Sequence, residues 1–281
     1  MTDLPKWILA KTQPGGALDR ALGVMARRSF AISETPTDEL ARLMKKNGSD
    51  KYGWLHSYTV AYSSLFDGMR ANVRNMLEVG IGTNYVDVPS TMGPNGVPGA
   101  SLRAWRDYFP NASVHGADVD KRILFKETRI DTHYVDQLSA EAIAAMWAEI
   151  GGEKFDVAID DGLHTYDANR SCMQNSLEHV KDGGFYIIED VVCGRPVEGG
   201  LSGTGNAQRF ADMLEATGYQ FALVALPHYF NREDNMLCFV EKRAAPADAG
   251  YAQRKQAWLD GLEATLLRAQ RVQKFKRFFG K

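Results

Sequence analysis

The sequence predicts an α/β fold built on a doubly wound sheet of seven mostly parallel strands. Apolar, strand-like runs alternate with helical patterns from Asn75 onward, as expected when helices cover both faces of a sheet. Turn residues separate these runs, as at Gly183 and Gly184 before the fifth strand and at Gly218 after a helix. The 281 residues, 44% apolar and 24% charged, suffice for one large core. Together these observations indicate a Rossmann-like layer.

The predicted elements divide the chain into three parts. Strands are expected at Val73–Val79, Ser113–Ala117, Thr132–Val135, Phe155–Ile159, Gly184–Ile188, Phe221–Leu226 and Met236–Glu241. Helices are expected between them at Leu102–Tyr108, Lys121–Thr128, Ala140–Ile150, Asp167–His179 and Ala207–Thr217. Before Asn72 the pattern is helical only, at Leu18–Arg28, Thr37–Lys46 and Leu55–Arg70. We therefore expect a helical cap (1–72), a sheet domain (73–243), and a linker with a carboxyl-terminal amphipathic helix (244–281).

Charge is distributed unevenly along the chain. The formal net charge is −2, from 33 basic and 35 acidic residues, and this balance argues against a nucleic-acid binder. From Asp248 onward eight basic residues face three acidic ones, a balance of +5, so the preceding 247 residues carry −7. The tail is basic and the body is acidic.

Apolar residues recur at helical spacing along this tail. They are Tyr251, Trp258, Leu262, Leu266, Ala269, Val272, Phe275 and Phe279. Such a stripe predicts packing on the same domain or on a sister subunit in a homo-oligomer. An anionic membrane surface is the alternative partner, contacted through Lys274, Lys276, Arg277, Phe278 and Phe279.

Cysteine usage and the amino terminus favour a cytoplasmic protein. Cys172, Cys193 and Cys238 are odd in number and follow no metal-binding spacing. The chain has no apolar run of about 18 residues, and its first residues lack a signal peptide's apolar stretch and cleavage site.

The end of the first strand carries the first ligand-binding signal. Gly80 and Gly82 follow Glu78 in the run EVGIG, so a ligand could approach the backbone and donate hydrogen bonds to the carboxylate. A dinucleotide fingerprint needs a third glycine, and Tyr85 stands there. This departure argues against a nicotinamide cofactor.

Two further acids stand at the ends of the next two strands. Asp118 ends the second strand, where a carboxylate can accept from both hydroxyls of a ribose, and Asp136 follows the third, where it could accept from an adenine amino group. Three acids in this arrangement suit a cationic adenosine ligand, S-adenosylmethionine, better than a pyrophosphate. The plain alternative is that each acid caps a helix.

Paired acids end the fourth and fifth strands. Asp160 and Asp161 stand in IDDGLH, and Glu189 and Asp190 stand in IIEDV. If these strands are neighbours, four carboxyl groups crowd one crevice, and their repulsion raises some of their pKa values unless a cation or hydrogen bonds compensate. Oxygen ligands favour magnesium as that cation. His164 follows in the same loop and could deprotonate a hydroxyl near neutral pH. The alternative is helix capping with a surface histidine.

These motifs resemble a known family. LEVGIG, PGASLRAWRDYFPNASVHGADVD, IDDGLHTYDANRSCMQNSLEHVKDGGFYIIEDV and SDKYGWLHSYTVAY are similar to class I methyltransferases of the macrocin and mycinamicin sugar O-methyltransferase type. The resemblance covers about Ser49–Val192, and the IDDGxH and IEDV pair is its most specific part.

The resemblance implies O-methylation of a hydroxyl on a sugar-bearing metabolite or glycan, dependent on S-adenosylmethionine and magnesium. The matching motif positions imply that Asp161, Glu189 and Asp190 hold the metal and that His164 is the general base. The implied cofactor site comprises Glu78, Gly80, Gly82, Asp118 and Asp136. Asp160 could belong either to this cofactor site or to the metal site. The long loop Thr83–Ala100 and the absence of the large amino-terminal domain of some relatives leave the acceptor and the oligomer open.

Substrate choice is expected in segments that overhang the carboxyl edge of the sheet. The candidates are Thr83–Ala100, Cys193–Asn206 and His228–Asp234. In the cap, five residues match the family's upstream motif and could close over the cofactor, or could simply pack and cap helices: Asp50, Lys51, His56, Tyr58 and Tyr62.

Two other functions remain open at this point. A nicotinamide-dependent oxidoreductase could use the same sheet, although Tyr85 and the acid cluster disfavour it. A non-enzymatic sensor or assembly subunit could bind an adenosyl ligand without needing His164.

Overall fold

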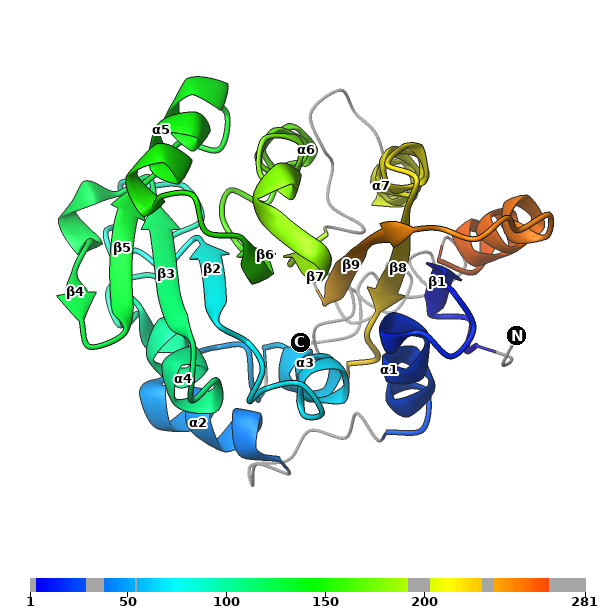
Figure 1. Cartoon of the computed structure of the whole chain (residues 1–281), viewed down its shortest axis with the longest axis horizontal. Coiled ribbons are helices and arrows are strands. Elements are labelled where there is room, and N and C mark those ends of the chain that lie inside the picture. The colour runs from blue at the N-terminus through cyan, green and yellow to red at the C-terminus, as the bar shows by residue number, and fades with distance from the viewer. Residues whose placement is uncertain (1–3, 29–37, 54, 192–202, 229–234, 263–281) are drawn as a thin grey trace, which may run out of the picture.

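A single nine-stranded mixed sheet forms the centre of the protein (Figure 1). The computed structural model describes residues 4–28, 38–53, 55–191, 203–228 and 235–262. The strand order is β1-β8-β9-β7-β6-β2-β3-β5-β4. The prediction of an α/β fold is confirmed, whereas the prediction of seven strands was wrong.

Seven strands lie where the sequence predicts them. They are β2 (Asn75–Val79), β3 (Ser113–Asp118), β5 (Ile130–Tyr134), β6 (Phe155–Asp160), β7 (Val180–Ile188), β8 (Tyr219–Ala225) and β9 (Met236–Ala244). The pairs β2–β3, β2–β6, β3–β5 and β6–β7 are parallel. Strand β9 runs antiparallel to both β7 and β8. With the two edge pairs, β1–β8 and β4–β5, four of the eight strand pairings are antiparallel. The expectation of a mostly parallel sheet therefore holds only for its centre.

The two unpredicted strands stand at the edges of the sheet. Strand β1 (Ile8–Lys11) pairs antiparallel with β8, and β4 (Lys126–Glu127) pairs antiparallel with β5. Strand β1 corrects the expectation of purely helical structure before Asn72. Instead of a helix over Lys121–Thr128, the chain forms the short 3₁₀ helix η1 (Lys121–Ile123) and then β4. Runs of two to four residues are too short to show a strand period.

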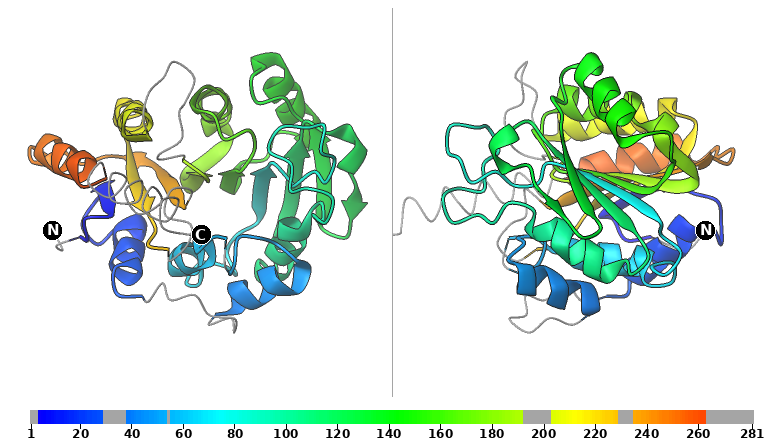
Figure 2. Two further views of the ribbon diagram at one scale, coloured as in Figure 1. Left: turned by 180° about the vertical axis from the view of Figure 1, so that it is seen from behind. Right: turned by 60° about the vertical axis from the view of Figure 1, so that its left-hand side comes forward.

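Helices cover both faces of the sheet (Figures 1 and 2). One face is covered by α1 (Ala17–Met25), α3 (Tyr58–Phe66) and α4 (Ala100–Tyr108), and α2 (Glu39–Asn47) packs on α4. The other face is covered by α5 (Ala140–Ile150), α6 (Tyr166–Gln174), α7 (Gly203–Ala216) and the helical residues 251–262, with the 3₁₀ helix η2 (Leu177–His179) leading into β7. Two apolar cores result, one on each face.

The described part of the basic tail packs on its own domain. Tyr251, Trp258 and Leu262 are buried in the core that α7 also joins. Lys255 Nζ lies 3.0 Å from both Asp212 Oδ1 and Glu215 Oε2 of α7. These contacts agree with the same-domain hypothesis for the start of the stripe. The residues named for a membrane contact, Lys274 to Phe279, lie outside the described residues, and no described helix is long and apolar enough to cross a bilayer.

Strand order fixes where the predicted acids meet. The order β7-β6-β2-β3-β5 is continuous, and these five strands run in the same direction. The seven predicted acids, which stand at the ends of these five strands, therefore lie at one edge of the sheet. The direction of strand succession reverses at β2, and ligands bind at such a point in doubly wound sheets.

A stacked histidine pair links β3 and β5. His115 Nδ1 lies 3.1 Å from His133 Nε2, and His133 Nδ1 lies 2.9 Å from Glu149 Oε1 of α5. Burial and the neighbouring His133 lower the pKa of His115. Folding therefore favours the neutral form of His115.

We predict that this pair makes stability fall in mild acid. Because the folded-state pKa of His115 is lowered, its contribution is intact above the unfolded value of about 6.5 and declines as pH falls through it, since the unfolded chain takes up the proton first. His115→Gln should therefore lose less unfolding free energy than the parent between about pH 7.5 and pH 5.5. Urea unfolding of both chains at the two pH values tests this, and equal losses would contradict it.

Candidate active site

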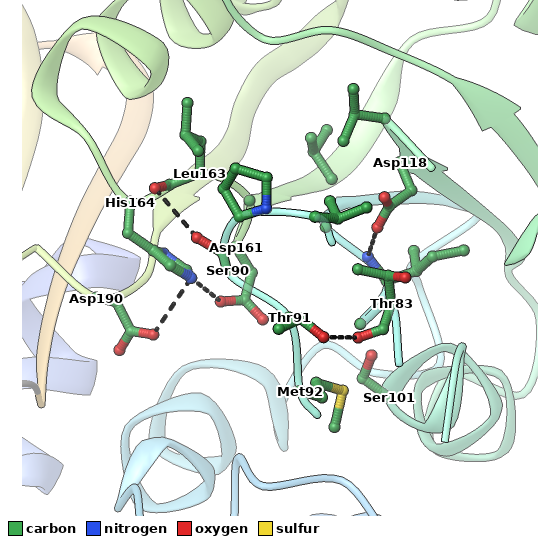
Figure 3. A pocket seen from close by; sticks show the side chains of 18 of the residues that line it. Thr83, Ser90, Thr91, Met92, Ser101, Asp118, Asp161, Leu163, His164 and Asp190 are labelled. Carbon is green, nitrogen blue, oxygen red and sulfur yellow. Dashed lines mark hydrogen bonds and ion pairs between the residues drawn. The ribbon is translucent and has the colours of Figure 1, made fainter. Parts of the chain in front are cut away.

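A cavity of about 350 Å³ lies at the carboxyl edge of the central strands (Figure 3). Its walls come from the ends of β2, β3, β5, β6 and β7, from Ser49–Lys51, and from the loop after β2. Of the predicted site residues, the cavity is lined by Gly80, Gly82, Asp118, Asp136, Asp161, His164 and Asp190. Three predicted residues, Glu78, Asp160 and Glu189, lie behind this wall in the protein interior.

The two glycines after β2 have no room for side chains. Gly80 has a φ of +85°, and a Cβ there would lie 2.0 Å from the carbonyl oxygen of Asp161. Gly82 has a φ of +81°, and its Cβ would lie 2.1 Å from Met92 Sδ. Both the left-handed backbone and the close packing require glycine. This turn exposes backbone to the cavity, as the sequence predicts.

Asp118 and Asp136 present carboxylates at the cavity wall. Asp118 Oδ2 accepts a hydrogen bond from Ile81 N at 2.9 Å, and Oδ1 accepts one from Asp120 N at 2.9 Å. Burial raises the pKa of Asp118. Asp136 Oδ1 accepts from Leu138 N at 2.9 Å. Because a carboxylate oxygen can accept more than one hydrogen bond, both acids retain acceptor capacity for a ligand.

An outer acid group faces the cavity, formed by Asp161, His164 and Asp190 (Figure 3). His164 Nε2 lies 3.9 Å from Asp161 Oδ1 and 3.8 Å from Asp190 Oδ2. The other ring nitrogen of His164 is buried, and it has no hydrogen-bond partner among the described residues. Asp190 also accepts a hydrogen bond from Tyr58 Oη, and His56 Nδ1 lies 3.7 Å from it. The structure thus brings two predicted metal ligands and the predicted base together.

An inner acid group lies directly behind the outer one and surrounds Lys51. The Lys51 Nζ atom lies 3.0 Å from Glu78 Oε1, 2.5 Å from Asp161 Oδ2 and 2.6 Å from Glu189 Oε2. Tyr62 Oη donates to the other oxygen of Glu189 at 2.5 Å, and Ser101 Oγ donates to Glu78 at 2.7 Å. Glu78 and Glu189 therefore contact protein groups rather than the cavity.

Burial and charge set the ionisation of the inner group. Burial raises the pKa of Glu78, and burial with the nearby Asp161 raises that of Glu189 well above its usual value; Lys51 opposes both shifts. Burial alone would lower the pKa of Lys51, but Asp161, Glu189 and Glu78 outweigh it and raise that pKa well above the usual value. Lys51 is therefore a stable buried cation.

Asp160 supports the β6–α6 loop from behind. Its carboxylate is fully buried, which raises its pKa, and accepts hydrogen bonds from Gln137 Nε2 at 2.5 Å and Tyr186 Oη at 3.3 Å. Gln137 Oε1 accepts in turn from Leu163 N at 2.7 Å. The resemblance left Asp160 open between the cofactor and the metal; in the structure its carboxylate contacts Gln137 and Tyr186 and does not line the cavity.

The cap segment contributes more than the sequence indicates. Two roles stood open for the five cap candidates, closing over a cofactor or packing and capping helices. In the structure Lys51, Tyr58 and Tyr62 contact the acids at the end of β7, and Asp50 and Lys51 line the cavity. The loop Thr83–Ala100 lines the cavity as expected. Most of Cys193–Asn206 and of His228–Asp234 lies outside the described residues.

The sequence did not predict the roles of three residues at the site. Gln137 and Ser101 hold Asp160 and Glu78, and Thr83 Oγ1 donates to Asp120 Oδ2 at 2.6 Å. Each is a common polar residue at an ordinary position. Their nearness to the predicted motifs was the only available signal.

Curated proteins similar to the chain are sugar O-methyltransferases. It is 32% identical over 271 residues to the L-olivosyl-oleandolide 3-O-methyltransferase of Streptomyces antibioticus, a match that covers 93% of the chain and 61% of that protein. It is 33% identical over 153 residues to the mycinamicin VI 2''-O-methyltransferase of Micromonospora griseorubida, covering 54% of the chain and 36% of the relative. The chain is a relative of the macrocin and mycinamicin sugar O-methyltransferases. The resemblance predicted from the motifs is thereby confirmed.

A solved structure supports the same relationship. The MycE methyltransferase of the mycinamycin biosynthetic pathway, in complex with Mg, SAH and mycinamycin VI, aligns with a TM-score of 0.55 and 28% identity, covering 75% of the chain and 56% of MycE. No family model matches the chain. The chain spans less than two thirds of the length of these sugar O-methyltransferases.

We predict that Gly80→Ala destabilises the protein. Its Cβ would meet the Asp161 backbone at 2.0 Å with φ at +85°, so the free energy of unfolding should fall by at least about 2 kcal/mol. Gly152→Ala is the matched control, since a Cβ there meets nothing within 4 Å. Chemical denaturation of both variants tests this; equal effects from the two would refute the steric account.

Proposed function

We propose that the chain is an S-adenosylmethionine-dependent, magnesium-dependent O-methyltransferase acting on a hydroxyl of a sugar-bearing metabolite or glycan. The observation that carries the proposal is that Asp161, His164 and Asp190 open into the same cavity as Gly80, Gly82 and Asp118. A proton acceptor and a cofactor pocket therefore share one space. The relatives' names describe methylation of sugar hydroxyls, and MycE is in complex with Mg and SAH.

The cavity fits S-adenosylmethionine. Its volume of about 350 Å³ is within the usual range for small-molecule sites. Gly80 and Gly82 line the cavity and carry no side chains of their own, so a ligand could approach their backbone there. Asp118 would accept from ribose hydroxyls and Asp136 from an adenine amino group, each with its remaining acceptor capacity. The acidic wall also suits the positive charge of a sulfonium.

The outer group fits a magnesium ion. Asp161 and Asp190 supply hard carboxylate oxygens at the cavity surface, the donor type that magnesium prefers. They would hold the ion. Glu189, the third ligand that the resemblance implies, already uses one oxygen on Lys51 and the other on Tyr62. When bound, the ion would make a nearby hydroxyl more acidic.

His164 would take the proton of the acceptor hydroxyl. A neutral imidazole can accept at Nε2, which lies between the carboxylates of Asp161 and Asp190. In the reaction the acceptor O–H bond breaks and its proton passes to Nε2. Bound S-adenosylmethionine would supply the methyl group for this oxygen, and its sulfur would keep the electron pair of the carbon–sulfur bond that is broken. The two carboxylates then stabilise the imidazolium.

The acceptor, assembly and location are parts of the same proposal. The acceptor is a small sugar-containing molecule, and neither a homo-oligomer nor a membrane contact of the tail is needed for the chemistry above. Cys172 is a buried cysteine that forms no disulfide within the described residues. An unbridged cysteine agrees with the cytoplasmic location expected from the sequence.

We predict that Asp118→Ala weakens S-adenosylmethionine binding at least about tenfold, because a charged acceptor for the ribose is lost. Calorimetric titration of the full chain with S-adenosylmethionine measures this. Asp182→Ala, which removes an exposed carboxylate outside the cavity, is the control and should leave the affinity unchanged. If the parent chain binds no S-adenosylmethionine, the proposed function is wrong.

We also predict that His164→Ala lowers turnover by about 10²–10⁴-fold while cofactor affinity changes little, since His164 acts on the acceptor proton. Methyl transfer to a panel of glycosylated macrolides, with magnesium present, provides the assay. His164→Gln preserves the polar character of the side chain without its basicity and should be equally slow. Undiminished turnover in both variants would exclude His164 as the base and favour a binding role for the site.

A further inference from the structure

A hydroxyl side chain that the sequence did not single out lies on the cavity wall beside the proposed base. Ser90, in the loop after β2, lines the cavity. Its Oγ donates a hydrogen bond to the carbonyl oxygen of Leu163 at 3.3 Å, and Leu163 directly precedes His164 (Figure 3). The loop after β2 and the loop that carries His164 therefore meet at Ser90.

The Ser90 hydroxyl has hydrogen-bonding capacity left for a ligand. Its bond to Leu163 is longer than the usual O–H···O distance of about 2.7–2.8 Å, and the hydroxyl oxygen also has two acceptor lone pairs. By contrast, Thr83, Thr91 and Ser101 on the same wall donate to protein oxygens at 2.6, 3.0 and 2.7 Å. Of these four hydroxyls, that of Ser90 makes the longest bond, so a better-placed ligand oxygen can replace its partner.

The backbone at Ser90 is held in an unusual conformation. Its φ is 56°, and Ser90, His164 and Asp190 are three of the four described non-glycine residues with a positive φ. All three line the cavity. Such conformations persist only where the surrounding structure imposes them, and they gather at functional sites. The strain therefore groups Ser90 with the residues proposed to carry the chemistry.

The base of the loop is anchored at the end of β3. Thr83 Oγ1 donates to Asp120 Oδ2 at 2.6 Å. Thr83 O accepts from Met92 N at 2.9 Å and from Thr91 Oγ1 at 3.0 Å, which closes the loop on itself. Asp120 N donates in turn to Oδ1 of Asp118, the proposed ribose acceptor, at 2.9 Å. One short segment thus holds both the cofactor acid and the loop.

Arg122 clamps the outer part of the loop. Its guanidinium donates to Asp120 through Nε at 2.7 Å, and to Asp87 through both terminal nitrogens at 3.1 and 3.2 Å. Its Cζ lies 3.8 Å from the centre of the Tyr85 ring. The hydrogen bonds from Arg122 lower the pKa of Asp120 to about 2, so this carboxylate is charged near neutral pH. The loop therefore presents Ser90 from a fixed base and a fixed turn.

We propose that Ser90 is a specificity-determining residue that binds a hydroxyl of the acceptor sugar other than the one methylated, and that Arg122 and Asp87 are positioning residues that hold it there. The inference rests on the proposed function for its acceptor. A sugar whose reacting hydroxyl faces His164 presents its other hydroxyls to the neighbouring wall, where Ser90 can donate to or accept from one of them. The loop then selects among sugars without taking part in proton transfer.

The first experiment measures acceptor binding by calorimetry. The full chain is saturated with S-adenosylhomocysteine and magnesium, and the ligands are a macrolide that carries one sugar and its monodeoxy analogues, each lacking one sugar hydroxyl. The parent should bind one analogue about 3–10-fold more weakly than the complete glycoside, as expected for one lost hydrogen bond. Ser90→Ala should bind that analogue and the complete glycoside equally. Unchanged discrimination against every analogue in Ser90→Ala would overturn the proposal.

Two substitutions at Ser90 separate the role of the hydroxyl from that of the backbone. Ser90→Ala keeps a side chain on a left-handed residue, whereas Ser90→Gly suits that backbone conformation. Both remove the hydroxyl, so both should lose the same discrimination, while their affinity for S-adenosylhomocysteine should equal that of the parent. If Ser90→Gly keeps the discrimination, the effect belongs to the backbone and the proposal is wrong.

Asp87→Ala tests the clamp, because it removes the loop's side of the contact. The Met92 amide, which donates to Thr83 O, should exchange its hydrogen faster, and the discrimination that depends on Ser90 should shrink. Combining Asp87→Ala with Ser90→Ala should lower acceptor affinity no further than Ser90→Ala alone, since one residue acts through the other. Full additivity of the two losses would overturn the positioning role.

Asp131→Ala is the matched control for the clamp. It removes another carboxylate that pairs with a basic side chain, Lys126, and neither residue lines the cavity. This variant should leave both the amide exchange of the loop and acceptor binding as they are in the parent. A response equal to that of Asp87→Ala would assign the effect to surface charge in general and overturn the positioning role.

The outcomes separate this inference from the proposed function. If the parent binds and methylates the glycosides, but Ser90→Ala and Ser90→Gly discriminate as the parent does, the inference fails and the proposed function stands. If the parent binds S-adenosylmethionine but none of the glycosides, the sugar acceptor and the inference fail together, while the cofactor site stands.

Discussion

The placement of several carboxylates at one edge of the sheet is the constraint on which the rest of the structure depends. Five neighbouring parallel strands, β7, β6, β2, β3 and β5, end at the same edge of the sheet. The acidic residues at these ends therefore lie close together. Like charges this close destabilise the fold unless cations or hydrogen bonds compensate. Lys51 supplies the compensation inside the protein. Breaking such a buried ionic contact by removing one partner typically costs about 3–5 kcal/mol.

The acidic side chains at the sheet edge form two sets that differ in burial. Glu78, Asp160 and Glu189 are completely enclosed, and their oxygens are used on Ser101, Gln137, Tyr62 and Lys51. These acids hold the loops and the cap segment together. Asp118, Asp136, Asp161 and Asp190 stand one layer further out and line the cavity. The first set makes the geometry rigid, and the second remains available to a ligand.

The sequence predicted the centre of the sheet and the acids at its edge, but not the interior contacts. The predicted helix Ala140–Ile150 coincides with α5, whose ends are marked in the structure by the Ser139 cap and by Gly151. Strands β1 and β4 were missed since short edge strands show no period. Glu78 was expected to contact the cofactor. Its position near the end of a strand does not reveal whether its side chain faces the cavity or the protein interior. Lys51 meets Asp161 across 110 positions, and no local pattern encodes such a contact.

Two of the four described non-glycine residues with a positive φ belong to the outer group. His164 and Asp190 have φ values of 57° and 50°, a left-handed conformation that costs about 1–3 kcal/mol for residues other than glycine. Around His164 the loop is fixed by Leu163 N on Gln137 and by the Thr165 cap of α6. Asp190 N donates to Tyr58 Oη at 3.3 Å. The buried contacts thus fix the two loops that carry His164 and Asp190. The imidazole and the carboxylates are therefore held close together before any ligand binds. This preorganisation links the protein interior to the chemistry at the surface.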